Sequence, residues 1–426
     1  MGMTLSKPQY SPDCSCDEAG SAGRLLSLEQ ALARGLALAS AVEEMERLPL
    51  ARATGRITAT AVRTTTPLPQ FDNAGMDGYA LRLSDMAGNG PWVLPVAGRV
   101  AAGDPPAECW PKGSVLRILT GAPVPDGADA VLMQEQADRQ EGRVVLHARP
   151  RRDENIRRRG EDLQAGAEIL PAGIEIGPRE AAALAVAGMG EVTVRRQVRV
   201  AIFSTGSELR EPGEPLAPGQ IWNANRYMLR AALDRRWVAL TDLGAVPDDA
   251  GALAAALRLA TETADMVITT GGVSVGDEDH MPRLVREAGG EIHAMRIAMK
   301  PGKPVTLGYL GAAVFAGLPG NPVSAFVTLK VLAAPILERL AGIGRPATRD
   351  RLVMPVAEAL DRKPGRLEFR PVRLVAPAEG GTRRIAWLAP SYSARVALLA
   401  GADGLAVIPP ALSHVAAGDY LEVLTF

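Results

Sequence analysis

Four segments in the second half of the chain combine glycine, lysine and acidic residues in patterns that suit the binding of an anion. They are residues 203–208, 269–279, 299–304 and 317–324. A glycine lets the backbone approach an anion and present its N–H group, and a lysine supplies a positive charge for phosphate or another oxyanion. One such segment alone is more often structural, but the four together predict a binding site for an anionic ligand.

Lys300 and Lys303 are the expected ligand-binding cations, because neighbouring prolines restrict the backbone that carries them. Asn321 is expected to cap a helix that begins near Pro322. Asp279 and the two acidic residues before it supply oxygen atoms of the kind that Mg²⁺ prefers. The other residues expected to contact the ligand are Thr205, Gly206, Gly271, Gly272, Ser274, Gly276, Pro301, Gly302, Pro319, Gly320 and Ser324.

Residues 272–276 also match the G-x-S-x-G pattern of a serine-hydrolase nucleophile elbow, in which Ser274 would be the nucleophile. Three acidic residues follow this motif and would oppose a developing oxyanion, and no HGGG-type oxyanion hole precedes it. A hydrolase is therefore the less favoured alternative. Zinc catalysis and a P-loop are disfavoured, because the four histidines show no metal-ligand spacing and no Walker A pattern occurs.

The elements that must position the anion-binding segments indicate an α/β domain. Strands are predicted over 198–204, 239–243 and 266–270, and they alternate with helices near 225–235 and 249–263. This alternation favours a parallel, doubly wound sheet with right-handed crossovers. Ligands bind such a sheet where the carboxyl ends of its strands meet, so we expect the four segments to lie along one edge.

Further helices are predicted from Ser27, with Gln30 completing a capping box, over 178–187 and over 322–341. We expect the first two to pack together. Short β-branched runs between turns predict β-domains on both sides of the α/β domain. The predicted α/β multidomain organisation is a disordered tail (1–23), a discontinuous N-terminal domain (24–66 with 150–195), an inserted β-domain (67–149), the doubly wound α/β domain (196–345) and a small, barrel-like C-terminal β-domain (346–426).

The composition excludes several classes of protein. Lys plus Arg number 47 and Asp plus Glu 48, so the net charge implies neither a nucleic acid partner nor a membrane partner. The three cysteines, Cys14, Cys16 and Cys109, are too few for a disulfide framework in a chain of 426 residues. No apolar run reaches the length of a membrane span and no signal peptide is recognised, so a cytoplasmic location is expected.

Six motifs, in order, resemble those of the MoeA and gephyrin E-domain family. They are M-D-G-Y-A at 76–80, T-G-A-P-V-P at 120–125, E-N-I-R-R-R-G-E-D at 154–162, G-G-V-S-V-G at 271–276, K-P-G-K-P at 300–304 and G-L-P-G-N-P-V-S at 317–324. Each N-terminal motif alone is typical of a surface turn with solvated charges. Six motifs in this order, over residues 27–426, indicate membership of the family.

The resemblance implies a four-domain subunit in an elongated homodimer, with an active cleft between the central domain of one subunit and the N-terminal segments of the other. It implies that molybdate and adenylylated molybdopterin, with Mg²⁺, are converted to molybdenum cofactor and AMP. The molybdopterin adenylyltransferase and molybdoenzyme acceptors are the implied partners. Because the gephyrin E domain also binds receptor peptides in clustering assemblies, a scaffold is the alternative function.

The resemblance also transfers site residues by motif. In the N-terminal half it implies that Asp77, Thr120, Glu135 and Asp162 line the cleft, with Asp77 and Asp162 orienting water or metal. In the central domain it implies that Asp248 and Asp279 position Mg²⁺ or the nucleotide phosphates, and that Lys300 and Lys303 bind molybdate or pyrophosphate oxygens.

Overall fold

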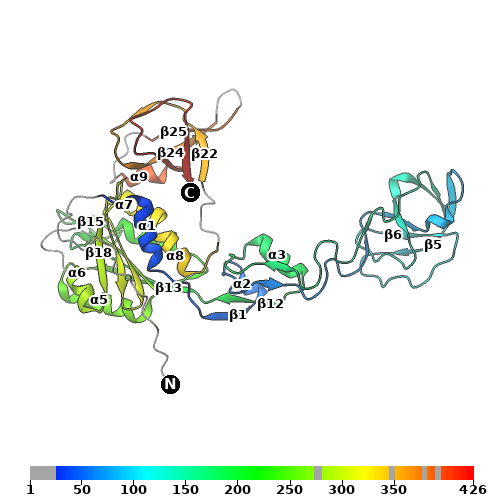
Figure 1. The fold of residues 1–426 in the computed structure, drawn as a ribbon, viewed down its shortest axis with the longest axis horizontal. Helices are drawn as coiled ribbons and strands as arrows, with labels where there is room; N and C mark the ends of the chain where they lie inside the picture. Colours follow the sequence, from blue (N-terminus) through cyan, green and yellow to red (C-terminus); the bar gives the residue numbers. More distant parts are fainter. Residues whose placement is uncertain (1–24, 273–280, 345–350, 377–380, 389–394) are drawn as a thin grey trace, which may run out of the picture. The chain divides into compact units, whose positions relative to one another are not determined.

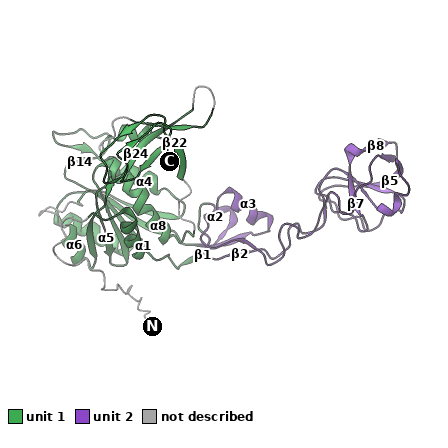
Figure 2. Ribbon diagram, turned by 45° about the horizontal axis from the view of Figure 1, so that its top comes forward, with its two compact units in different colours: residues 1–45, 55–57, 195–426 green, residues 46–54, 58–194 purple. Residues whose placement is uncertain are grey.

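The structure, a computed structural model, describes residues 25–272, 281–344, 351–376, 381–388 and 395–426. The tail 1–23 and the candidate residues Ser274, Gly276 and Asp279 lie outside these ranges. The chain divides into two compact units (Figure 2): unit 1 contains residues 1–45, 55–57 and 195–426, and unit 2 contains residues 46–54 and 58–194. No helix within the described ranges has both the length and the apolar character needed to cross a membrane.

A six-stranded sheet forms the centre of unit 1 (Figure 1). In order across the sheet, its strands are β16 (Val238–Val246), β13 (Val198–Thr205), β17 (Met266–Thr270), β21 (Ala313–Leu318), β20 (Pro304–Leu310) and β18 (Glu291–Arg296). The first four strands are parallel, whereas β20 and β18 are each antiparallel to the strand before them in this order. The predicted parallel sheet is confirmed for four strands, and the antiparallel pair was not predicted.

Helices cover both faces of this sheet. Successive residues of a strand point to opposite faces, so each strand contributes to two cores. Val200 and Ile202 of β13 share a core with α1 (Leu28–Ala37), α4 (Ala224–Leu233), α7 (Pro322–Thr328) and α8 (Ala334–Leu340). Ala201 and Phe203 share a second core with α5 (Ala250–Thr263) and α6 (Met281–Glu287). The doubly wound α/β fold predicted from the sequence is therefore confirmed.

The capping box at the start of α1 is present, because the N–H of Gln30 donates to Ser27 Oγ (3.2 Å) and the N–H of Ser27 donates to Gln30 Oε1 (3.0 Å). The helix at 178–187 belongs to the other compact unit, so the predicted packing of α1 against it stays a prediction. α1 packs on α8, whereas α3 (Pro178–Val186) packs on α2 (Leu50–Ala53). Both α1 and α3 have an apolar face, and the spacing of apolar residues does not specify which surface that face meets.

The helix predicted over 322–341 is interrupted by a π-helical turn at Leu329–Ala333, between α7 and α8. Pro335 lies in the first turn of α8. Proline has no N–H group, and in a regular α-helix its ring would clash with the carbonyl group of Val331, four residues earlier. The wider π-helical turn accommodates the ring without ending the helix.

A second six-stranded sheet forms the C-terminal part of unit 1. Five of its strands are β22 (Arg351–Pro355), β24 (Leu367–Val375), β25 (Arg384–Trp387), β26 (Gly404–Ile408) and β28 (Tyr420–Thr425). The sixth is β19 (Met299–Lys300), which pairs in parallel with β24. The C-terminal β-domain is thus confirmed as a β-structure, but the sequence did not predict that part of the segment 299–304 joins its sheet.

Unit 2 contains a third six-stranded sheet. Its strands, in order, are β7 (Ala130–Met133), β4 (Gly78–Leu81), β6 (Val115–Ile118), β5 (Trp92–Val100), β9 (Arg143–Leu146) and β8 (Ala137–Gln140). One core forms around Ile118 and another around Leu132. The inserted β-domain is therefore confirmed as a fold, while the exact domain limits stay predictions.

A partly buried ion network fixes the start of β17. Asp265 lies 2.6 Å from Nη1 of Arg196 and 3.0 Å from Nη2 of Arg199, and it accepts the backbone N–H of Arg199 (2.7 Å). Burial raises the pKa of Asp265, but the hydrogen bonds from the two arginines outweigh it, so the pKa lies below its ordinary value. The ionised carboxylate is therefore the form that the folded protein stabilises.

We expect Asp265→Asn to lower the free energy of unfolding by about 2 kcal/mol, because it removes the charge from the hydrogen bonds that the largely buried Arg196 guanidinium donates to this carboxylate. Since folding depresses this pKa, the stabilisation is complete above the pKa of the unfolded chain and is lost as the pH falls through the folded value. Denaturant unfolding at neutral and acidic pH measures both effects, and the difference between variant and wild type should shrink in acid.

The matched control is Glu287→Gln, which removes a carboxylate from an exposed ion pair with Arg283. Its expected effect is within about 0.5 kcal/mol. Equal losses for the two variants would show that burial of the Asp265 network does not matter.

Candidate active site

The ends of three parallel strands lie side by side in the central sheet. Thr205 ends β13, Thr270 ends β17 and Leu318 ends β21, and Thr270 pairs with Ser204 on one side and Leu318 on the other. β20 runs antiparallel to β21, so its first residue, Pro304, lies at the same edge. The described parts of the four predicted segments therefore meet at one edge of the sheet, as expected.

At this edge, the turn that follows β17 lies against the turn that follows β13. Gly271 has a φ of 86°, and a Cβ atom there would lie 2.4 Å from the carbonyl oxygen of Thr205, so the position requires glycine. A Cβ atom on Gly320 would lie 3.9 Å from the Cα of Gly271. Three segments that are distant in sequence thus place backbone atoms close together, which suits close approach of a phosphate or a pterin ring.

A chain of buried polar groups supports these turns. Thr270 Oγ1 donates to Ser204 Oγ (3.0 Å), and Ser204 Oγ donates to Asn223 Oδ1 (3.1 Å). Asn225 Nδ2 donates to the carbonyl oxygen of Gly320 (2.7 Å). The sequence analysis missed both asparagines, although Asn223 is the N-cap of α4 and the preference of asparagine for that position was a usable signal.

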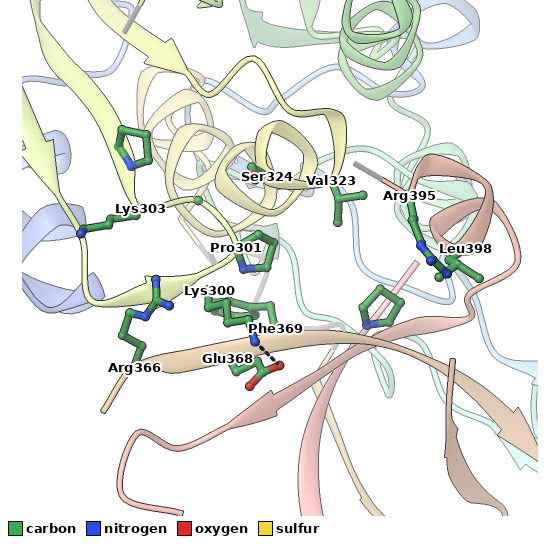
Figure 3. Close-up of a pocket in the computed structure, with 13 residues that line it drawn as sticks. Lys300, Pro301, Lys303, Val323, Ser324, Arg366, Glu368, Phe369, Arg395 and Leu398 are labelled. Carbon is green, nitrogen blue, oxygen red and sulfur yellow. Dashed lines mark ion pairs between the residues drawn. The ribbon is translucent and has the colours of Figure 1, made fainter. Parts of the chain in front are cut away.

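A cavity of about 370 Å³ lies beside the start of β20, between the K-P-G-K-P segment, the first turn of α7 and β24 (Figure 3). Five predicted residues line it: Lys300, Pro301, Gly302, Lys303 and Ser324. The C-terminal domain adds Arg366, Arg395 and Glu368, none of which the sequence analysis identified. Four cations and one carboxylate in the wall make the cavity suitable for an anion.

The K-P-G-K-P loop holds its lysines on a tightly packed backbone. Gly302 has a φ of 103°, and a Cβ atom there would lie 2.6 Å from Met299 Cε and 2.7 Å from Thr328 Oγ1. The N–H of Ile297 donates to the carbonyl oxygen of Lys303 (2.8 Å) and closes the loop. Glycine is therefore needed at position 302 for both its conformation and its size.

The other predicted ligand-binding residues of the central domain are at the strand edge but not in the walls of the cavity. These are Thr205, Gly206, Gly271, Gly272, Pro319, Gly320 and Asn321. Asn321 occupies the N-cap position of α7, as predicted, but its side chain makes no capping hydrogen bond. Capping propensity is an average over helices, and it does not fix the side-chain rotamer at one position.

Asp248 follows β16, at the same edge but on the outermost strand, and it is exposed. Three strands lie between β16 and β20, the strand that begins beside Lys303. With neighbouring strands about 4.8 Å apart, Asp248 and the lysines are separated by roughly 20 Å along the edge. A small oxyanion cannot contact both, whereas an extended ligand can.

In unit 2, three N-terminal motifs meet around β3 (Asn73–Ala74). β3 pairs with β10 (Ile156–Arg157), and the N–H of Ala74 donates to the carbonyl oxygen of Ala122 (2.9 Å). Arg158 forms ion pairs with Asp72 and Asp153. Motifs that are far apart in the sequence therefore form one polar surface in this unit.

Asp77, Thr120 and Glu135 belong to one hydrogen-bonded cluster. Asp77 Oδ1 accepts the N–H (2.7 Å) and the Oγ1 hydroxyl (2.8 Å) of Thr120, and the carbonyl oxygen of Asp77 accepts the N–H of Gln134 (3.0 Å). The side chain of Gln134 donates to Glu135 Oε1 (3.2 Å) and accepts from Arg117. Gln134 and Arg117 are further polar members that the sequence analysis missed.

Asp162 lies apart from this cluster as far as the described contacts show. Its backbone N–H donates to the carbonyl oxygen of Leu68 (2.9 Å). No hydrogen bond or ion pair among the described residues joins its carboxylate to Asp77. Its predicted role in the cleft stays a prediction.

The surroundings of Asp77 keep it ionised. The backbone N–H of Thr120 and then its hydroxyl lower the pKa of Asp77, with a smaller contribution from the positive charge of Arg117. A carboxylate with a lowered pKa is an acceptor or a ligand for a cation at neutral pH, and not a proton donor.

Comparison with known proteins covers most of the chain. Residues 26–188 match the model of the MoeA N-terminal region (domains I and II), 201–339 that of a probable molybdopterin binding domain, and 353–426 that of the MoeA C-terminal region (domain IV). A molybdopterin molybdenumtransferase of Haemophilus influenzae is 40% identical over 347 residues, which are 81% of this chain and 85% of that protein. The chain belongs to the MoeA family.

Two further relatives agree with this membership of the MoeA family. Molybdopterin molybdenumtransferase 2 of Mycobacterium tuberculosis is 35% identical over 384 residues, or 88% of this chain and 94% of that protein. A crystal structure of a molybdopterin biosynthesis MoeA protein from Pyrococcus horikoshii has 26% identity and a TM-score of 0.78, and the match covers 95% of this chain and 100% of that one.

The two carboxylates predicted to hold Mg²⁺ in this MoeA-family chain were Asp248 and Asp279. Asp279 lies outside the described residues. The neighbour of Asp248, Asp249, is the N-cap of α5 and accepts the N–H groups of Gly251 and Ala252, so its carboxylate is already in use. Within the described ranges, no group of three or more His, Cys, Asp and Glu side chains is placed to hold a metal ion.

We expect Thr120→Val to raise the pKa of Asp77, because the variant loses the hydroxyl hydrogen bond and keeps the backbone one. Thr120→Ser retains a hydroxyl group and should leave the pKa close to that of the wild type. Titration of the Asp77 carboxyl carbon by NMR measures both variants. An unchanged pKa in Thr120→Val would mean that the hydroxyl does not stabilise the ionised form.

Proposed function

We propose that this protein inserts molybdenum from molybdate into adenylylated molybdopterin, which forms molybdenum cofactor and releases AMP. The observation that carries the proposal is the cavity lined by four cations at the ligand-binding edge of the α/β sheet. The curated relatives named above are molybdopterin molybdenumtransferases, which gives the anion its chemical class. Molybdate is a tetrahedral dianion whose oxygen atoms accept hydrogen bonds from ammonium and guanidinium groups.

In this proposal the cations and the backbone turns bind different parts of the substrates. Lys300, Lys303, Arg366 and Arg395 bind molybdate oxygens in the cavity and neutralise their charge. The turns at Gly206, Gly271 and Gly320 bind the adenylylated pterin, because glycine lets its phosphates approach the backbone closely. The roughly 20 Å between Asp248 and the lysines fits an elongated nucleotide-bearing substrate.

In the reaction that we propose, molybdenum forms bonds to the two dithiolene sulfurs, and one oxygen of molybdate leaves as water with the two thiol protons. A water molecule cleaves the phosphoanhydride, so that AMP leaves and a phosphate stays on the pterin. Both events bring negative charge to the sheet edge, because molybdate and the pyrophosphate group are anions. The cavity cations lower the energy of this assembly in the same way that preorganised donors stabilise charge in other transferases. They also hold the two substrates close together, which reduces the entropic part of the barrier.

The proposal includes a homodimer, in which Asp77, Thr120, Glu135 and Asp162 of one subunit face the lysines of the other. The support is that three of these four residues share one hydrogen-bonded region and that Asp77 is kept ionised. Carboxylates held in this form can orient a water molecule or a metal aquo ion. They do not themselves neutralise an oxyanion, so we assign them to orientation.

Mg²⁺ is part of the proposal as a resident cation, with Asp248 and Asp279 as its carboxylate ligands. The described residues supply only Asp248 to such a site, and this alone does not make the set of oxygen ligands that Mg²⁺ requires. Magnesium would supply charge neutralisation at the phosphates. We assign no step of the reaction to it.

A cytoplasmic location, delivery of the substrate by a molybdopterin adenylyltransferase, and transfer of the product to molybdoenzymes complete the proposal. A peptide-binding scaffold of the gephyrin E-domain type is the alternative, and a serine hydrolase that uses Ser274 is a weaker one. The four cavity cations favour an enzyme over a scaffold, because a scaffold has no physical need for a concentrated anion site.

Reconstitution with purified protein, adenylylated molybdopterin, Mg²⁺ and molybdate tests the proposed reaction. We expect AMP release that depends on molybdate and a product that activates an apo-molybdoenzyme. AMP release that is independent of molybdate would favour a hydrolase, and the absence of both products with an intact dimer would favour the scaffold.

Lys303→Gln should lower kcat/KM for molybdate by about 10- to 100-fold, since a charge-assisted hydrogen bond contributes about 1.5–3 kcal/mol. Lys363→Gln is the matched control, because Lys363 is exposed and does not line the cavity. Steady-state kinetics with varied molybdate measure both variants. Equal values for the two variants would remove Lys303 from the oxyanion site.

A further inference from the structure

Glu368 is a buried carboxylate in the wall of the cavity, and the proposed reaction gives it no role. It belongs to β24 and is 2% exposed. Its Oε2 accepts Nε–H of Arg362 (2.9 Å), and its Oε1 lies 3.4 Å from Nε of Arg370 and 3.6 Å from Nζ of Lys300. One carboxylate therefore contacts three cations, which is more than its single negative charge needs for neutralisation.

The three cations differ in what else they contact. Arg362 donates its other N–H groups to three backbone carbonyl groups, and its side chain is 4% exposed, so its role is structural. The side chain of Arg370 is 16% exposed. That of Lys300 is 48% exposed and lines the cavity. Of the three, Lys300 is the cation through which Glu368 can act on a ligand.

The backbone brings Lys300 and Glu368 into register. They are direct partners in the parallel pairing of β19 with β24, and the N–H of Leu367 donates to the carbonyl oxygen of Ala298 (2.9 Å). Figure 3 shows the Lys300 ammonium above the Glu368 carboxylate, with Arg366 beside it. A separation of 3.6 Å is longer than a good hydrogen bond, so the ammonium protons remain available to an incoming oxyanion.

We propose that Glu368 is a positioning residue, whose buried carboxylate holds the Lys300 ammonium at the cavity wall before an oxyanion binds. This inference rests on the proposed molybdate site. A lysine has a flexible four-carbon stem, and an unanchored one loses rotamer freedom when it binds a ligand. Because Glu368 restricts the Lys300 side chain when the protein folds, the binding of an oxyanion does not have to cost this rotamer entropy.

Glu368→Gln tests this role, because glutamine keeps the size of the side chain and an acceptor for Arg362 but loses the charge that attracts Lys300. We expect the Kd for molybdate, measured by calorimetry on the intact protein, to rise about tenfold. The KM for adenylylated molybdopterin should stay within about twofold. Glu422→Gln is the matched control: it removes a carboxylate from an exposed ion pair on β28, away from the cavity, and should change neither constant.

A double-mutant cycle with Lys300→Gln separates positioning from a general structural effect. If Glu368 acts through Lys300, the Glu368→Gln change has no further effect on molybdate binding once Lys300 is replaced. If Glu368→Gln weakens binding by the same factor in both backgrounds, the positioning role is overturned.

Glu368→Asp keeps the proposal testable if the glutamine variant does not fold. It retains the charge for Arg362 but withdraws the carboxylate from Lys300, so the Kd for molybdate should rise by a smaller factor. An unchanged Kd in a folded Glu368→Asp variant overturns the proposal.

The proposed reaction can fail separately from the positioning role. If the wild type binds molybdate without releasing AMP, the reaction is disproved and the calorimetric cycle still decides the role of Glu368. If the wild type binds no molybdate, the positioning role fails as well.

Discussion

The cavity depends on the pairing of two short backbone segments, β19 with the start of β24. This pairing takes two residues out of a loop of the central domain and places them in the C-terminal sheet. It determines where Lys300 lies, because the strand register sets which face of the sheet its side chain uses. It also brings Arg366 and Glu368, from a distant part of the sequence, to the same cavity. Without it, Lys300 would lose its place beside Glu368, and Arg366 and Glu368 would not line the cavity.

Electrostatic balance follows from the same pairing. A buried carboxylate is costly unless cations and hydrogen bonds surround it, and Glu368 has three cations around it. The cations that line the cavity would repel one another if no carboxylate were near them. One buried negative charge therefore lets the protein collect lysines and arginines at one place while the cavity stays positive. Fixing a lysine costs up to about 2 kcal/mol of rotamer entropy, and this arrangement pays that cost during folding.

Much of the central domain could be predicted because local pattern and topology agree there. The alternation of strands and helices predicted the order of elements. The rule on strand ends placed four segments at one edge of the sheet, where the structure has their described parts. Arg366, Arg395 and Glu368 could not be found in this way, since their position depends on a pairing between strands far apart in the chain. Asn225 was missed for a similar reason, because its partner, Gly320, is in another segment. The same limit holds for helices, because the apolar face of α1 does not specify that the helix packs on α8.

The strand edge divides into two chemical regions, and this division lets two anionic ligands bind without competing for the same cations. Around Gly271 and Gly320 the surface consists of backbone atoms, which buried hydroxyl and amide groups support. This surface suits a ligand that carries little charge apart from its phosphates. Around Lys303 the surface is charged and suits a compact dianion. A dianion held in the cavity lowers the local positive charge, so it weakens the attraction for a second anion at the same place. Substrates with separate subsites avoid that competition. In the reaction that we propose, a phosphate at the glycine turns leaves the cavity cations to molybdate.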